Sequence, residues 1–109
     1  MIEIYNLTAH QEWDDIVRSF ADYDVYYLSG YVRAFYVHGD GEPQLLYYTS
    51  KQFRAIYVYM KRPTTITNVY DSVTPYGYGG VLFEGDKSDL SLSDFWKEYV
   101  QKMNDENII

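Results

Sequence analysis

The spacing of apolar residues predicts three amphipathic helices, over 9–21, 29–38 and from Ser91 to about residue 103. In each segment apolar side chains recur at intervals of three and four residues, which places them on one helix face. The first face consists of Trp13, Ile16, Val17 and Phe20. The second consists of Leu28, Tyr31, Val32, Phe35 and Tyr36. The third, the most regular, consists of Leu92, Phe95, Trp96, Tyr99, Val100 and Met103. We expect all three faces to be buried, and Ser91 to cap the last helix.

Strands are predicted before the first helix and between the second helix and the third. Residues 2–5 alternate apolar and charged side chains, which is typical of a short strand. Residues 44–49 and 53–61 predict an antiparallel hairpin, because only 50–52 separate them. The second of these strands is largely apolar on both faces, so we expect it to be central in its sheet. The pattern predicts one domain over 1–109 of the α/β (α+β) class, with a small, mainly antiparallel mixed sheet flanked by about three helices.

Composition narrows the possible functions. The 109 residues carry a net charge of −7, which argues against a nucleic-acid partner or an anionic membrane surface. The absence of cysteine excludes disulfides, a thiol nucleophile and cysteine metal sites. His10 and His38 are not spaced as metal ligands, so we expect no metal.

No apolar run approaches the ~20 residues of a membrane span. The first residues lack signal-peptide features, so we expect a cytoplasmic protein.

A tyrosine- and glycine-rich segment covers residues 70–82 and reads Y-D-S-V-T-P-Y-G-Y-G-G-V-L. Its proline fixes one backbone angle, and its glycines permit backbone conformations closed to other residues. The glycine spacing fits neither phosphate-binding loop pattern. The commoner interpretation is a turn that closes a sheet, and the alternative is a ligand site.

Three side chains in this segment are candidates for chemistry. Asp71 is suited to act as a base, to orient a substrate amine, or to accept hydrogen bonds from the backbone of the following turn. The last role is the commonest for an aspartate before a turn. Tyr76 and Tyr78 are suited to donate a hydrogen bond to a carbonyl or to act as a general acid. The pattern alone does not choose between these roles.

The run D-S-V-T-P-Y-G-Y-G-G, from Asp71 to Gly80, resembles a motif in the first half of GNAT-type acyltransferase domains. The motif reads D-x-x-[ST]-P-Y-G-Y-G-G, and the closest resemblance is to Fem-like peptidoglycan aminoacyltransferases and related acetyltransferases. The predicted order of strands and helices is also similar to the opening half of such a domain. The resemblance implies transfer of an acyl or aminoacyl group to an amine on a small molecule or cell-wall precursor.

The resemblance also implies roles for particular residues. Asp71 and Tyr76 are the implied catalytic residues, and the implied substrate-binding residues are Thr74, Tyr78, Gly79 and Gly80. Acyl-CoA is the implied cofactor of the parent enzyme, bound by elements that would follow Ile109, so none is expected in this chain. Fem-like relatives use an aminoacyl-tRNA donor instead, and the acidic balance gives no support for tRNA binding. By itself the chain is expected to be inactive.

A different class of function stays open. A non-catalytic module could recognise a sugar or peptide by stacking on Tyr76 and Tyr78. A dimerisation module could pair an open sheet edge with a second copy. The apolar pair Ile108 and Ile109 reads as the beginning of a strand. We expect that strand to be completed by the remainder of a longer chain or by a partner.

Overall fold

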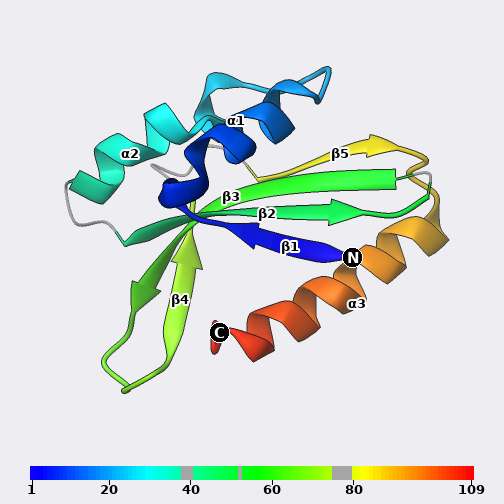
Figure 1. Ribbon diagram of the computed structural model, residues 1–109. Helices are drawn as coiled ribbons and strands as arrows, with labels where there is room; N and C mark the ends of the chain where they lie inside the picture. The colour runs from blue at the N-terminus through cyan, green and yellow to red at the C-terminus, as the bar shows by residue number, and fades with distance from the viewer. Residues whose placement is uncertain (38–40, 52, 75–79) are drawn as a thin grey trace.

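The computed structural model of the protein describes residues 1–37, 41–51, 53–74 and 80–109. Within these ranges a five-stranded sheet lies between helices on both faces, which confirms the predicted α+β class (Figure 1). The strands are β1 (Ile2–Tyr5), β2 (Glu42–Thr49), β3 (Phe53–Pro63), β4 (Tyr70–Val73) and β5 (Val81–Gly85). The helices are α1 (His10–Arg18), α2 (Ser29–Val37) and α3 (Asp89–Asp105). Short 3₁₀ turns cover Leu7–Ala9 and Val25–Tyr27.

β3 is the central strand, as its two apolar faces predicted. It pairs with β2 along one edge, and β2 in turn pairs with β1. Along its other edge, the end of β3 pairs with β4 and the beginning pairs with β5. All of these pairings are antiparallel. β4 and β5 are therefore two parts of one returning edge strand, interrupted between residues 73 and 81.

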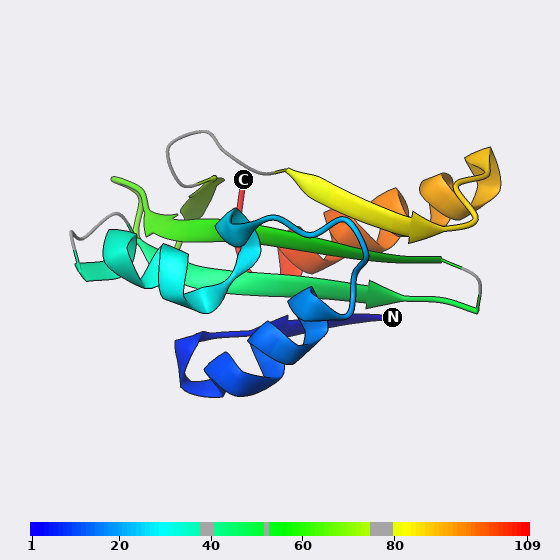
Figure 2. The same ribbon diagram turned by 90° about the horizontal axis from the view of Figure 1, so that it is seen from above.

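The side chains of β3 divide between two cores. Ile56 and Val58 join the core under α1 and α2, whereas Ala55 and Tyr59 join the core against α3. Both views place α1 and α2 on one face of the sheet and α3 on the other (Figure 2). This alternation agrees with the period of two predicted for the strand.

Two helix boundaries differ from the prediction for identifiable reasons. α1 ends at Arg18 rather than near residue 21, because groups from the sheet bind the backbone that a longer helix would use. The guanidinium of Arg54 donates to the Ser19 carbonyl, and the Ala21 amide donates to Glu84. α3 begins one turn earlier than expected, since Ser88 accepts a hydrogen bond from the Ser91 amide and caps the helix.

Three side chains predicted to be buried are exposed. Tyr36 of α2 is 54% exposed, and on α3 Trp96 is 44% and Val100 56% exposed. Phe95 and Met103 take the buried positions of α3, which lie against the sheet. The apolar face of α3 is wider than the surface that the sheet covers, so one flank of the helix stays open to solvent.

No helix in the described ranges is long and apolar enough to cross a membrane.

Candidate functional site

The tyrosine- and glycine-rich segment begins in β4 and ends in β5. Its residues 70–74 and 80–82 are described, whereas Tyr76, Tyr78 and Gly79 lie outside the described residues. Gly80 has a φ of 133°, a conformation that favours glycine. The Tyr27 hydroxyl donates to the Gly80 carbonyl at 3.2 Å, which fixes this end of the segment to the layer of α1 and α2.

Asp71 is held by a cross-strand ion pair. Arg62 of β3 stands opposite it, and the guanidinium Nε and Nη2 donate to the two carboxylate oxygens at 2.9 and 2.8 Å. These hydrogen bonds, with the charge of Arg62, hold the pKa of Asp71 below its usual value. A carboxylate with a lowered pKa is a poor base near neutral pH. The geometry therefore favours an orienting or electrostatic role over proton abstraction, and sequence reasoning had not identified Arg62 as the partner.

The outer edge of β4 begins a parallel pairing. The Tyr70 amide donates to the Asn107 carbonyl at 2.8 Å, and the Ile109 amide donates to the Tyr70 carbonyl at 2.9 Å. These two bonds form a parallel bridge between Tyr70 and Ile108. α3 thus crosses over one face of the sheet and returns the chain beside the beginning of β4. Ile108 makes only this isolated bridge, so the strand predicted from Ile108 and Ile109 stays a prediction.

A hollow of about 240 Å³ lies beside this bridge. Its lining includes Ser72, Tyr99, Val100 and Ile109. Burial raises the pKa of Tyr99, so its hydroxyl stays protonated near neutral pH and is available as a donor. The hollow joins the exposed flank of α3, where Trp96 packs edge-on against Phe83 of β5. The outer edge of β4 is therefore paired only at its beginning, at Tyr70, and apolar side chains of α3 lie beside it.

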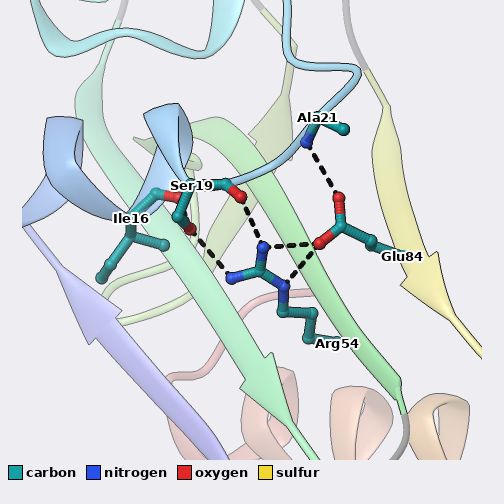
Figure 3. Close-up of polar contacts among 5 residues, drawn as sticks. All are labelled: Ile16, Ser19, Ala21, Arg54 and Glu84. Atoms are coloured by element: carbon teal, nitrogen blue, oxygen red, sulfur yellow. Dashed lines mark hydrogen bonds and ion pairs between the residues drawn. The ribbon is translucent and has the colours of Figure 1, made fainter.

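A second polar cluster, around Arg54, fastens the end of α1 to β3 and β5. Arg54 donates from Nε and Nη2 to one Glu84 oxygen and from Nη1 to the Ser19 hydroxyl, as Figure 3 shows. The Ser19 hydroxyl donates to the Ile16 carbonyl. The Arg54 guanidinium also lies 4.0 Å from the centre of the Phe20 ring.

Every group in this cluster bonds another protein group, so its role is structural. The hydrogen bond from the Ala21 amide, together with Arg54, holds the pKa of Glu84 below its usual value. Sequence reasoning missed the cluster, although one signal was present. Arg54 stands on a face of β3 that is otherwise apolar, and an arginine in such a position needs a partner.

The described residues contain no group of three histidine or acidic side chains placed to hold a metal ion. Comparison with family models, curated proteins and solved structures gave no match for this chain.

Proposed function

We propose that the chain is the N-terminal half of a cytoplasmic GNAT-type acyltransferase domain, which transfers an acyl or aminoacyl group to an amine acceptor. The main support for this proposal is the position of the motif in the sheet. The segment with the acyltransferase-like motif begins in β4 and leads to β5, and Tyr70, the residue before Asp71, makes an isolated parallel bridge with Ile108. In this proposal a strand that continues from Ile109 extends the sheet next to the motif. An acyl donor bound between that strand and β4 would lie beside the motif.

The reaction is a direct transfer. The acceptor nitrogen attacks the acyl carbonyl carbon, an N–C bond forms, and the C–S bond of a thioester or the C–O bond of an aminoacyl ester breaks. The thiol or hydroxyl leaves, and the acceptor nitrogen loses one proton. Such a reaction needs alignment of the amine and stabilisation of the developing oxyanion more than a protein nucleophile. Asp71 and Tyr76 are the proposed catalytic pair, with Asp71 orienting the amine and Tyr76 donating to the oxyanion.

Thr74, Tyr78, Gly79 and Gly80 form the proposed acceptor-binding surface in this scheme. Backbone groups of the two glycines would approach the acyl carbonyl closely, because glycine carries no side chain. The acyl-CoA would bind elements beyond Ile109, so this chain alone binds no cofactor and is inactive.

The open edge supports the half-domain part of the proposal. Val100 beside β4 and Trp96 beside β5 expose apolar surface, and apolar surface of this kind is usually covered by a partner or a further part of the fold. An added strand that continues from Ile109, parallel to β4, would cover both side chains. A second copy of the chain could cover the same surface, which is the dimerisation alternative.

The test is an acyl-transfer assay on the protein translated from the whole reading frame. Release of free CoA from acetyl-CoA would be followed with a thiol reagent in the presence of a panel of primary amines, and aminoacyl-tRNA would be the second donor. We expect amine-dependent turnover with one donor, and Tyr76→Phe should lower kcat about tenfold or more through the loss of one oxyanion donor. Tyr23→Phe, an exposed tyrosine outside the segment, is the control. Absence of turnover with both donors would contradict the proposed activity.

A further inference from the structure

Gly41, Arg62 and Asp71 form a row across three neighbouring segments of the sheet. Arg62 of β3 is paired with Asp71 of β4, and on the other side of β3 Lys61 is paired with Glu42, the first residue of β2. The same register, continued by one residue, places Gly41 opposite Arg62. Arg62 thus lies between a carboxylate that it binds and a residue that has no side chain.

Gly41 leaves the space that the aliphatic stem of Arg62 occupies. A Cβ atom at position 41 would lie 2.7 Å from Arg62 Cγ and 2.9 Å from the Lys61 carbonyl oxygen. The first distance is well below the optimum of about 3.5–4.0 Å for two carbon atoms, and the second involves the backbone of β3. Gly41 also has a φ of 116°, a conformation that favours glycine. The available space and the backbone angle therefore both require glycine at this position.

The guanidinium at the other end of the Arg62 side chain binds Asp71 as a fork. Nε and Nη2 donate to the two carboxylate oxygens at 2.9 and 2.8 Å, and such a pair of bonds fixes the orientation of both groups. The two side chains are 44% and 36% exposed, so water replaces these bonds when the arginine stem moves. The position of the Arg62 stem against Gly41 therefore determines how the Asp71 carboxylate is held.

We propose that Gly41 is a positioning residue for Asp71 and acts through Arg62. The absence of a side chain at position 41 lets the Arg62 stem reach the place from which its guanidinium grips the carboxylate. A larger residue there displaces Arg62, and Asp71 then loses both its fixed orientation and its bound cation. The use of Asp71 to orient the acceptor amine rests on the proposed function, whereas the link from Gly41 to Asp71 does not.

The contact itself is tested in the natural 109-residue chain. We expect nuclear Overhauser effects between the α protons of Gly41 and the γ protons of Arg62, because the Arg62 stem lies against the glycine. This measurement does not depend on the folding of any variant. Absence of these effects would overturn the proposal.

The variant Gly41→Ala tests whether the contact controls Asp71. Its Asp71 pKa should rise toward the ordinary value, because the displaced guanidinium no longer stabilises the carboxylate. The pKa is measured by ¹³C NMR titration of the carboxyl carbon. Gly30→Ala is the matched control and should leave the pKa unchanged, since among the described residues a Cβ atom there meets nothing beyond its own helix within 4 Å. An unchanged pKa in Gly41→Ala would overturn the proposal.

A double variant shows whether Gly41 acts through Arg62. In Gly41→Ala/Arg62→Gln the Asp71 pKa should equal that of Arg62→Gln alone, because the guanidinium is already gone. A purely structural effect of Gly41 on the beginning of β2 does not predict this equality. A further rise of the pKa in the double variant would contradict a role through Arg62.

The protein translated from the whole reading frame gives a separate readout. Gly41→Ala should lower kcat for acyl transfer about tenfold through misalignment of the acceptor, and leave KM for the acyl donor unchanged because the donor binds elsewhere. No turnover by the natural protein would contradict the proposed function, whereas the titration would still decide the link from Gly41 to Asp71. An unaltered kcat in Gly41→Ala, with the Asp71 pKa raised, would contradict the positioning role.

Discussion

Tyr70 pairs with Ile108 in parallel, and both backbone groups of Tyr70 are used in the pairing. Alternation along a strand points the amide of Ser72, two residues further on, in the same outward direction. Within the described residues the parallel pairing consists of the two hydrogen bonds of Tyr70, so the Ser72 amide faces the open edge of β4.

Hydrogen exchange should reveal this difference between two neighbouring amides. We expect the Ser72 amide to exchange rapidly in the 109-residue chain, because it faces the open edge, and the Tyr70 amide to exchange slowly. Exchange is measured residue by residue with NMR at several protein concentrations. Protection of Ser72 that increases with concentration would show that a second copy pairs with the edge, and would favour the dimerisation alternative.

Arg62 controls the ionisation of Asp71. Arg62→Gln removes the two hydrogen bonds and the charge that favour the carboxylate, so the pKa of Asp71 should rise toward its ordinary value. The measurement is a pH titration of the Asp71 carboxyl carbon by ¹³C NMR. Lys97→Gln, which removes a cation from α3 on the other face of the sheet, is the control and should leave that pKa unchanged. An unaltered pKa in Arg62→Gln would contradict the ion pair.

Loss of the Arg54 guanidinium should destabilise the fold. Arg54→Met keeps the aliphatic part of the side chain but removes its bonds to Glu84 and Ser19. The pair is partly exposed, so we expect a loss of roughly 1 kcal/mol, which lowers the Tm of a domain of this size by about 4–8 °C. Arg18→Met, at the exposed last residue of α1, is the control. Equal Tm values for the two variants in thermal unfolding would show that the cluster contributes nothing.

The same cluster makes stability depend on pH. The folded state lowers the pKa of Glu84, so its carboxylate stabilises the fold above the ordinary glutamate pKa. That contribution is lost as the pH falls through the lowered value. Glu84→Gln should therefore be less stable than the natural chain at pH 7, with a smaller difference in acid. Urea unfolding at a series of pH values measures this, and a constant difference at every pH would contradict it.

A buried hydrogen bond joins two strands under α3. The Tyr59 hydroxyl donates to Gln44 Oε1 at 2.7 Å, and both residues are buried. Tyr59→Phe or Gln44→Leu alone leaves a buried polar group without its partner, so each should cost roughly 1–3 kcal/mol of unfolding free energy. The double variant should cost less than the sum of the two, because both polar groups are gone.

Denaturant unfolding of the natural chain, the two single variants and the double variant measures the coupling energy between Tyr59 and Gln44. Tyr5→Phe is the control, since among the described residues the exposed hydroxyl of Tyr5 bonds Glu3 alone, and its cost should stay within about 0.5 kcal/mol. Additive costs in the double variant would show that Tyr59 and Gln44 act independently.

The fold could be predicted largely from apolar periodicity. β3 was recognisable as central because Ala55 and Tyr59 on one face and Ile56 and Val58 on the other are all apolar. The same reasoning failed at Trp96 and Tyr36, because an apolar stripe shows which face of a helix avoids water but not how wide a surface is available to cover it.

Polar partners were harder to predict than the core. The pairing of Asp71 with Arg62 depends on the register between β3 and β4, which the 64–69 turn sets and which no local pattern reveals. The Arg54 cluster joins residues about 30 positions apart, and the row of Gly41, Arg62 and Asp71 joins three separate segments. Such sites depend on tertiary arrangement. A sequence can therefore show a charged residue on an otherwise apolar face, but not the group with which it forms an ion pair or hydrogen bond.

The measurement that tests the central claim most directly is the coding sequence that follows the codon for Ile109. We predict that the frame continues into an apolar strand, which would run parallel to β4, and then into a glycine-rich loop that opens a helix. A stop codon immediately after Ile109 would contradict the half-domain proposal. The open edge beside Tyr70, Trp96 and Val100 would then have to be covered by a second copy of the chain.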